Sequence, residues 1–249
     1  ALFHDITELK QTDEIRRDFV ANVSHELRTP LSILRGYIET LLDDPNLSGE
    51  EVNRILEVMK KHSGRLNALT DDLLTLARLE SANPNLQLEE VRLSELFAAI
   101  VRDWASKFAD RKLRIDVNVA CDVPVIQADA TRLQEVLYNL LDNAVKYSEP
   151  NGRIRLQATR HNDQVALSVT DTGTGIGKAD LPRIFERFYR TDKARSRELG
   201  GTGLGLSIVK HIAQMHGGSV EAESAVGQGT TIRVLLPVQP ASTSAVTES

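Results

Sequence analysis

The stretch SGEEVNRILEVMKKHSGRLNALTDDLLTLARLE, residues 48–80, decides the first half of the fold. Its seam positions follow one another in alternating steps of 3 and 4 residues, and they are Val52, Ile55, Met59, His62, Leu66, Leu69, Leu73 and Leu76. A repeat of this kind predicts a long amphipathic helix that packs along one face. Ser48 and Glu51 form a capping box that sets its start. Because His62 occupies a seam position, we expect a packed or interface residue there.

A second helix precedes this one along the chain. Between Asp13 and Leu42 the apolar positions again repeat at helical spacing, and they are Val23, Leu27, Leu31, Leu34, Ile38 and Leu41. The short break DDPNL, residues 43–47, allows a tight turn and predicts an antiparallel hairpin. Because a lone hairpin cannot bury both seams, we predict that two copies pair into a four-helix bundle, making a homodimer.

The composition changes after residue 80. The segment SANPN, residues 81–85, is small and polar and contains a helix-stopping proline, so residues 81–90 are expected to form a hinge. Beyond it, helical and alternating periods mix. Helices are predicted over 93–109, 130–147 and up to 216, and strands over 113–119, 153–160, 164–170, 219–223 and 230–237. The chain is therefore expected to be an α+β multidomain protein whose second domain, residues 91–238, is an α/β sandwich. The tail 239–249 is expected to be disordered.

Composition excludes several classes of protein. Lys and Arg total 30 against 35 Asp and Glu, a net charge of −5, which argues against nucleic acid as a partner. Cys121 is the single cysteine, so it can form no intrachain disulfide and no cysteine-cluster metal site. No apolar run approaches the ~20 residues that a membrane-spanning helix needs.

The segment SHELRTPL, residues 24–31, lies within the first predicted helix. At ~100° per residue, His25 lies about 200° around the helix from the seam residue Leu27, so its ring is expected to face water. Glu26 is its immediate neighbour, and Thr29 falls on the same face. An exposed imidazole beside a carboxylate can act as a nucleophile, with the acid accepting the proton from the other ring nitrogen. Taken alone, the pattern also fits an ordinary solvated histidine.

The segment NLLDNAVKY, residues 139–147, places Asn139 and Asn143 on one face of a predicted helix, with Lys146 close by. Amide oxygens can help to hold Mg²⁺, which usually completes its shell with water and substrate phosphates. A polar surface stripe is the alternative interpretation of this segment.

Two glycine-rich segments, DTGTGIG at 171–177 and GTGLGL at 201–206, follow a strand and open a helix. Glycines let a backbone approach a base or a phosphate, and N–H groups at a helix start favour an anion. Neither segment has the spacing of a Walker loop or of a dinucleotide fingerprint, and an ordinary turn remains the alternative. Cations interleaved with aromatic residues lie between them and fit a lid over a polyphosphate; they are Arg183, Arg187, Arg190, Lys193, Arg195 and Arg197.

In their order along the chain, these segments resemble the boxes of bacterial two-component sensor histidine kinases of the HisKA type, close to the phosphate-sensor-like group. SHELRTPL resembles the H box, NLLDNAVKYS the N box, DTGTGIG the G1 box, RIFERFYR the F box and GGTGLGLSIVKHI the G2 box. The resemblance covers residues 13–237. It implies a dimerising helical hairpin at residues 13–80, followed by a Bergerat-type ATP-binding sandwich of the kind found in Hsp90-like and MutL-like ATPases.

The resemblance also implies roles for single residues. His25 would be the phosphoacceptor, Glu26 the general base, and Thr29 the residue that orients water when the regulator is dephosphorylated. Arg190 would reach the γ-phosphate, and Asn143 would ligate Mg²⁺. The residues implied to surround ATP are Asn139, Asn143, Lys146, Tyr147, Asp171, Gly173, Gly175, Ile176, Gly201, Thr202, Gly203, Leu204, Gly205 and Leu206. Among these, Asp171 would accept a hydrogen bond from the adenine amino group.

The implied activity is an ATP- and Mg²⁺-dependent histidine kinase that passes its phosphoryl group to an aspartate of a response regulator receiver domain. The chain would be the cytoplasmic portion of a sensor anchored in the inner membrane, with residues 1–12 as the end of a PAS-like domain or a signalling linker. Two alternatives are a conformational ATPase of the Hsp90-like group and a non-catalytic scaffold. SHELRTPL argues against the first, and the complete N, G1 and G2 segments argue against the second.

Overall fold

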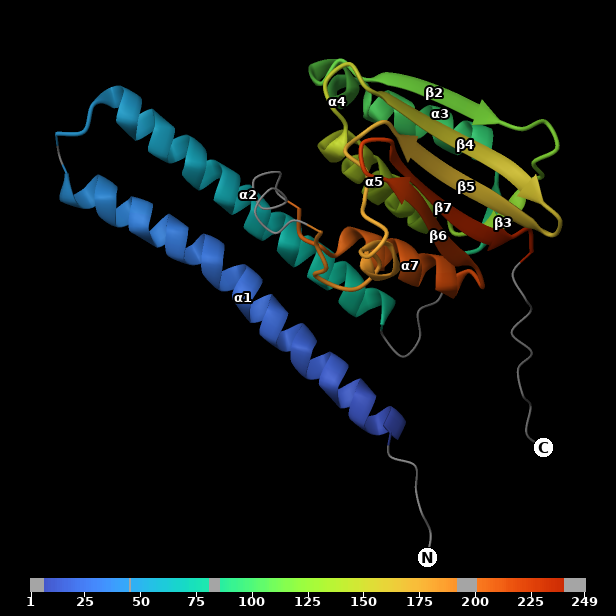
Figure 1. Ribbon diagram of the computed structural model, residues 1–249, viewed down its shortest axis with the longest axis horizontal. Coiled ribbons are helices and arrows are strands. Elements are labelled where there is room, and N and C mark those ends of the chain that lie inside the picture. Colours follow the sequence, from blue (N-terminus) through green and yellow to red (C-terminus); the bar gives the residue numbers. More distant parts are fainter. Residues whose placement is uncertain (1–6, 45, 81–85, 192–200, 240–249) are drawn as a thin grey trace, which may run out of the picture. The chain divides into compact units, whose positions relative to one another are not determined.

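The computed structural model of the chain describes residues 7–44, 46–80, 86–191 and 201–239 (Figure 1). It divides into two compact units, one formed by residues 1–74 with 192–204 and the other by residues 75–191 with 205–249. No helix among the described residues combines the length and the apolar character needed to cross a membrane. Of the predicted tail 239–249, all but the first residue lies outside the described part.

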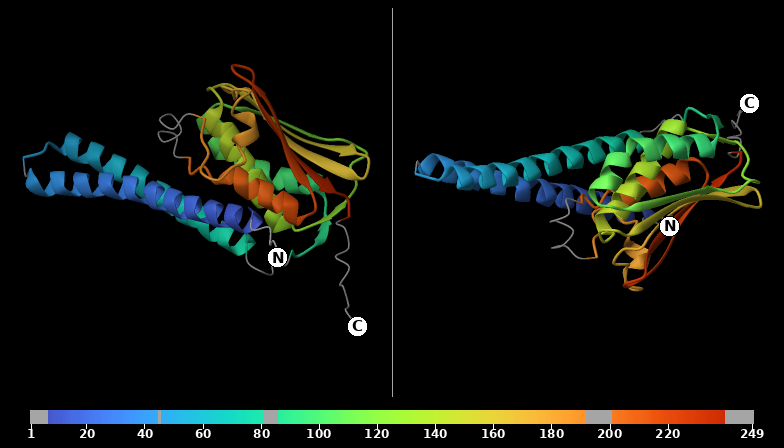
Figure 2. Two further views of the ribbon diagram at one scale, coloured as in Figure 1. Left: turned by 60° about the horizontal axis from the view of Figure 1, so that its bottom comes forward. Right: turned by 90° about the horizontal axis from the view of Figure 1, so that it is seen from above.

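The first unit is built on the predicted helical hairpin. Helix α1 (Thr7–Asp43) continues through Pro30, and helix α2 (Gly49–Leu79) runs back beside it (Figures 1 and 2). The capping box is present, because the Ser48 N–H donates to Glu51 Oε2 at 2.9 Å and the Glu51 N–H donates to Ser48 Oγ at 3.3 Å. Residues 7–12, part of the segment expected to be the end of a PAS-like domain or a signalling linker, are helical and extend α1.

The two seams of the hairpin differ from each other in burial. Ile55 and Leu69 of α2 are buried, as their seam positions predict. On α1, however, Leu31 is 54% and Ile38 is 45% exposed within the single chain. Two helices cannot cover both apolar stripes, so this row of α1 is left without cover in one chain.

The second unit contains a five-stranded sheet with the strand order β2-β4-β5-β7-β6. Its strands are β2 (Arg114–Val119), β4 (Arg153–His161), β5 (Gln164–Asp171), β6 (Ser219–Ala225) and β7 (Gly229–Pro237). Strand β2 is parallel to β4, and the other neighbours are antiparallel. Helices α3 (Leu93–Asp103), α5 (Ala130–Tyr147) and α7 (Gly205–Met215) cover one face of the sheet (Figures 1 and 2). The predicted α/β sandwich is confirmed.

The core of this unit lies between the helices and the sheet. Helix α5 buries the apolar side predicted for it, which consists of Leu133, Val136, Leu137, Leu140, Leu141 and Ala144. On β5, Val165, Leu167 and Val169 form the matching buried row. Side chains alternate between the two faces of a strand, so Asp171 continues this buried row at the end of β5.

Two short features differ from the sequence-based expectation. Strand β1 (Glu89–Val91) pairs antiparallel with β3 (Ile126–Ala128), so residues 89 and 90 belong to a small sheet and not to the hinge. The helix predicted over 93–109 is two helices, α3 and α4 (Ala105–Asp110), which meet at Trp104. A single 3-10 turn, η1 (Leu181–Arg183), begins the F-box segment. Strands of 3 residues are too short to show a readable alternation.

Candidate functional site

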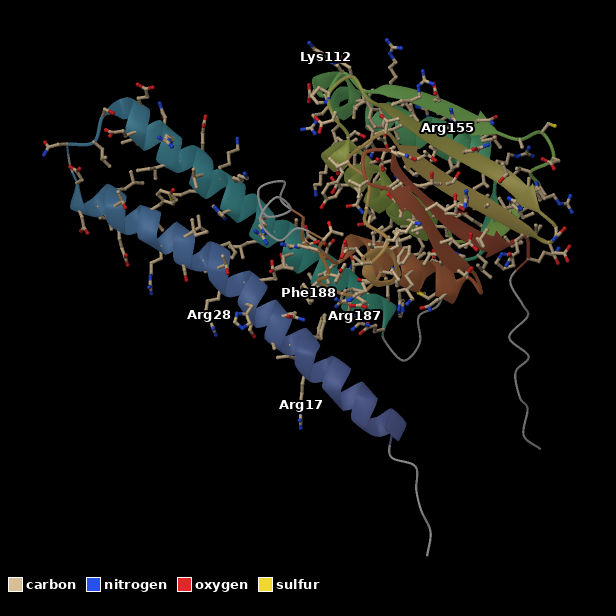
Figure 3. All side chains as sticks on the ribbon, in the orientation of Figure 1. Arg17, Arg28, Lys112, Arg155, Arg187 and Phe188 are labelled. Carbon is tan, nitrogen blue, oxygen red and sulfur yellow. The ribbon has the colours of Figure 1, made fainter. Side chains whose placement is uncertain are left out.

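His25 lies on the outer face of α1 and is exposed. One turn later, Thr29 is also exposed, and its hydroxyl donates to the His25 carbonyl oxygen at 3.2 Å. Arg28, which belongs to the same segment, points away from α2 (Figure 3). The H-box segment therefore presents an imidazole and a hydroxyl to solvent from a regular helix, and either group is accessible to an incoming partner.

Glu26, next to His25, turns toward the interior of the hairpin. Arg65 of α2 donates from Nη2 to Glu26 Oε2 at 2.6 Å, and the two side chains are only 8% and 22% exposed. We did not predict this contact, because Arg65 belongs to none of the boxes. The signal was nevertheless present, since Arg65 follows the seam position His62 by three residues and precedes Leu69 by four. A cation at this spacing lies on the packed stripe.

His62 is half-buried on that same stripe, in keeping with the packed position expected for it. Burial lowers the pKa of its imidazole, and the neighbouring cations Arg65 and Lys61 lower it further. Its Nδ1 atom is buried and makes no hydrogen bond in the described structure. Inside the hairpin these effects favour the neutral form of the His62 ring.

The N-box residues lie on α5, which is capped at both ends. Asp129 Oδ1 accepts from the Arg132 N–H at 3.0 Å at the start of the helix. At the other end, Arg111 Nη2 donates to the carbonyl oxygens of Val145 and Ser148 at 3.3 and 3.2 Å. A cation at this end also complements the helix dipole. Both caps hold α5 rigid where the predicted site lies.

Along α5, the predicted site residues have different surroundings. The Asn139 amide donates to the Glu135 carbonyl oxygen at 2.9 Å, which leaves its Oδ1 atom available as an acceptor. Asn143 is half-buried one turn later, and Lys146 forms an ion pair with Asp142. Among the described residues no group of three or more His, Cys, Asp or Glu could hold a metal ion. Asn143 stays the predicted ligand of Mg²⁺.

Asp171 is the last residue of β5, the central strand of the sheet, and 9% of its surface is exposed. Burial raises its pKa, although hydrogen bonds from the Gly173 and Thr230 backbones partly offset that effect. The Gly173 N–H donates to Asp171 Oδ1 at 2.8 Å. These two backbone donors hold the carboxylate in place, and its remaining lone pairs suit it to accept from a ligand.

The glycines of the G1 segment pack against the chain itself. A Cβ on Gly173 would lie 2.3 Å from the Tyr147 carbonyl oxygen, and a Cβ on Gly175 would lie 1.9 Å from the Ala225 carbonyl oxygen. Gly175 also has a φ of +68°, which disfavours any larger residue. Tyr147 joins the loop through its backbone, since its carbonyl accepts from the Thr174 N–H at 3.2 Å. From the sequence, these glycines were expected to let the backbone approach a base or a phosphate. In the structure, the absence of their side chains lets other parts of the protein backbone pack closely against them.

The start of α7 meets the N box. A Cβ on Gly205 would lie 2.6 Å from Asn139 Oδ1, so a larger residue would force the Asn139 amide to shift. Direct contacts thus join Gly205 to Asn139, and Gly173 to Tyr147 and Asp171, and helix α5 carries both Asn139 and Tyr147. Leu206 follows on α7 and is half-buried.

Other predicted residues are not joined to this group by the described contacts. Gly201, Thr202, Gly203 and Leu204 cluster with the first unit. There the Thr202 hydroxyl donates to Asp72 Oδ2 at 2.6 Å. Arg190 is half-buried at the end of the F-box segment, and the lid residues Lys193, Arg195 and Arg197 lie outside the described residues. For all of these, a place beside a nucleotide stays a prediction.

The turn between β6 and β7 is a part of the site that sequence reasoning missed. Ser224 Oγ accepts from the Ile176 N–H at 2.8 Å, and the Gly227 N–H donates to the Thr174 carbonyl oxygen, also at 2.8 Å. A Cβ on Gly229 would lie 2.0 Å from the Asp171 carbonyl oxygen. The pattern Gly-Gln-Gly directly after a strand was the available signal.

Known protein families match both halves of the chain. Residues 128–240 match the family described as histidine kinase-, DNA gyrase B- and HSP90-like ATPase, and residues 15–82 match the His Kinase A (phospho-acceptor) domain. The phosphate regulon sensor protein PhoR of Pseudomonas aeruginosa is 42% identical over 234 residues, which are 92% of this chain and 52% of the relative. The sensor protein SrrB of Staphylococcus aureus is 38% identical over 233 residues, 94% of this chain and 40% of the relative. The chain therefore spans about half the length of these curated relatives, or less.

Solved structures show the same relationship. Full-length ShkA in complex with AMPPNP is 31% identical, with a TM-score of 0.65 over 88% of this chain and 45% of its own. ThkA in complex with the response regulator TrrA is 26% identical, with a TM-score of 0.71 over 95% of this chain and 69% of its own. The mycobacterial sensor histidine kinase MprB is 30% identical, with a TM-score of 0.52 over 62% of this chain and 99% of its own. With the hairpin, the sandwich and the five boxes all in place, the chain belongs to the HisKA-type bacterial sensor histidine kinases, in the phosphate-sensor-like group.

Proposed function

We propose that this chain is the catalytic core of an ATP-dependent protein histidine kinase that phosphorylates itself on His25. The observation that carries the proposal is the exposure of His25 on α1, beside a carboxylate held in place by Arg65. In phosphoryl transfer, the main tasks of the protein are to position the reacting groups and to neutralise the charge on the phosphates. A solvent-facing imidazole on a rigid helix meets the first of these requirements.

In the proposed reaction, a His25 ring nitrogen forms a bond to the γ-phosphorus of ATP while the bond between that phosphorus and the ADP oxygen breaks. The proton on the other ring nitrogen passes to Glu26, which acts as general base. The phosphoryl group then moves to an aspartate of a response regulator receiver domain. When the regulator is dephosphorylated, the exposed Thr29 hydroxyl would orient the water molecule that takes part.

The nucleotide would bind in the second unit, at the group formed by Asn139, Asp171 and the G1 segment. Asp171 is buried, and the Gly173 and Thr230 backbones hold its carboxylate, which suits this group to accept from an adenine amino group. The half-buried amide of Asn143 fits Mg²⁺, which takes oxygen ligands and keeps several waters. When bound, the ion would neutralise charge on the phosphates. The AMPPNP complex of ShkA supports ATP as the ligand.

We also propose that the active form is a homodimer. The uncovered row of α1 includes Leu31, Ile38 and Leu42, of which Leu42 is 77% exposed. An open groove of about 520 Å³ on the same helix is lined by Ser24, Leu27, Arg28, Leu31, Ser32 and Arg35. A second copy would cover such a row in a four-helix bundle. The relatives are named sensor proteins and extend beyond the matched region, and we propose that this chain is the cytoplasmic part of a membrane-anchored sensor.

The phosphoacceptor assignment is tested by labelling with γ-labelled ATP and Mg²⁺, followed by acid and alkali treatment. The unaltered chain is expected to carry a label that acid removes and alkali leaves in place, as a phosphorylated histidine does. His25→Gln should carry none while still binding ATP, because the second unit is untouched. His161→Gln, which alters an exposed histidine of β4, is the matched control and should label normally. Label of the same acid and alkali behaviour on His25→Gln would overturn the assignment.

A further inference from the structure

Ser224, at the end of β6, connects two segments that border the proposed nucleotide site. Its hydroxyl oxygen accepts from the Ile176 N–H at 2.8 Å and donates to the Gly229 carbonyl oxygen at 2.7 Å. The Thr230 hydroxyl lies 2.9 Å from the same oxygen. Ser224 lies outside the five boxes, and half-burial shields these hydrogen bonds from competing water.

The other described contacts between residues 172–177 and this turn are made by the backbone. The Gly227 N–H donates to the Thr174 carbonyl oxygen, and Gly175 packs on the Ala225 carbonyl. A side-chain substitution does not remove backbone contacts of this kind. Among these contacts, the Ser224 hydroxyl is therefore the one that a conservative substitution can delete without adding bulk.

The same turn also holds Asp171. The Thr230 backbone donates to its carboxylate, and Gly229 packs on its carbonyl oxygen. Ser224 consequently links the loop that follows Asp171 to the strand that fixes Asp171. We propose that Ser224 is a positioning residue for the nucleotide base, which sets both the affinity for ATP and the preference for adenine. This inference rests on the proposed function.

The preference for adenine follows from the chemistry of the two purines. Adenine presents an amino donor at the position where guanine presents a carbonyl acceptor. A carboxylate acceptor therefore favours adenine only if the base is held at a defined distance and angle. A G1 loop released from Ser224 would hold the base less firmly, so that discrimination against GTP would weaken along with affinity.

The test compares the unaltered chain with Ser224→Ala, Ser224→Thr and Ser219→Ala, measuring autophosphorylation at varied ATP and at varied GTP. Ser224→Ala should raise KM for ATP about tenfold, the size expected when one or two hydrogen bonds are lost. Its kcat should be unchanged, and its preference for ATP over GTP should fall. Ser224→Thr keeps the hydroxyl and should restore KM. Ser219→Ala alters an exposed serine of the same strand and should have no effect.

Two results would overturn the inference. One is an unchanged KM and an unchanged purine preference in Ser224→Ala. The other is an equal loss of kcat in Ser224→Ala and Ser224→Thr with no change in KM, because that pattern indicates a general structural role. If Ser224→Ala fails to fold, Ser224→Cys replaces it, and its KM should still rise because sulfur is a weaker acceptor. Failure of the unaltered chain to bind ATP would instead overturn the proposed function.

Discussion

At the scale of single residues, the H-box segment separates two neighbours of different character. His25 faces solvent, while Glu26 forms an ion pair with Arg65 inside the hairpin. The pair holds the Glu26 carboxylate against Arg65 of α2. A largely buried charge that loses its partner is destabilising, because neither water nor a counter-ion replaces it fully.

We predict that Arg65→Ala destabilises the hairpin by about 3 kcal/mol, the low end for breaking a buried pair, because Glu26 keeps some exposure. Thermal unfolding followed by circular dichroism measures this effect. Arg35→Ala is the matched control, since Arg35 and Glu39 form an exposed pair on α1. That control should change stability by less than about 0.5 kcal/mol. Equal effects of the two substitutions would contradict the prediction.

At the scale of elements, one buried network ties the start of α5 to the end of α7. His216 is 2% exposed, its Nδ1 lies 2.8 Å from the Ile212 carbonyl oxygen, and its Nε2 lies 3.1 Å from the Asp129 backbone nitrogen. This geometry assigns the proton to Nδ1 and makes Nε2 the acceptor. Asp129 Oδ2 in turn accepts from the Gln87 N–H at 3.0 Å. The His216 imidazole therefore links α7 to the start of α5, and Asp129 links both to the chain before β1.

The network predicts how the stability of the second unit depends on pH. Burial lowers the pKa of His216 below its usual 6.5. The unfolded chain therefore binds the proton first, and the stabilisation is complete above pH 6.5 and is lost as the pH falls toward the lower folded value. Trp104, the one tryptophan, is buried in this unit, so its fluorescence reports unfolding.

We expect His216→Gln to be less stable at neutral pH and to lose less stability than the unaltered chain between neutral and mildly acidic pH. The measurement is denaturant unfolding followed by Trp104 fluorescence across that range. His161→Gln, which alters an exposed ring, should keep the original dependence. An unaltered slope in His216→Gln would show that another group controls the acid sensitivity.

At the scale of the whole molecule, the uncovered row of α1 predicts the assembly. Leu31 and Ile38 occupy seam positions yet remain about half exposed in one chain. Burying apolar area stabilises association by roughly 25 cal/mol per Å². A charged residue in that row would be buried in the bundle without a partner of opposite charge. The dimer should therefore dissociate.

Leu31→Asp is therefore expected to shift the chain from dimer to monomer, as measured by light scattering after size-exclusion chromatography. Val226→Asp introduces the same charge at an apolar residue of the second unit that is 74% exposed, and it should leave the dimer intact. If both variants remain dimeric, the row of α1 that contains Leu31 is not the interface between copies.

Much of the architecture was predictable because it depends on local patterns. The heptad of residues 52–76 and the capping box at Ser48 predicted α2, and alternation predicted β4 and β5 with their turn. The buried side of α5 was also predicted residue by residue. Helical and strand periods depend only on the spacing of apolar residues within one segment, so they can be recognised without a three-dimensional structure.

The sequence by itself determined the two-part architecture and the exposure of His25, since both follow from the periodicity of single elements. Only the tertiary structure decided that Arg65 pairs with Glu26, that Ser224 holds the Ile176 backbone, and that the G1 glycines make room for backbone. The two partners are 39 positions apart along the chain in the first contact and 48 positions apart in the second. Contacts of this kind depend on how whole elements pack against one another, so the periodicity within one segment does not predict them.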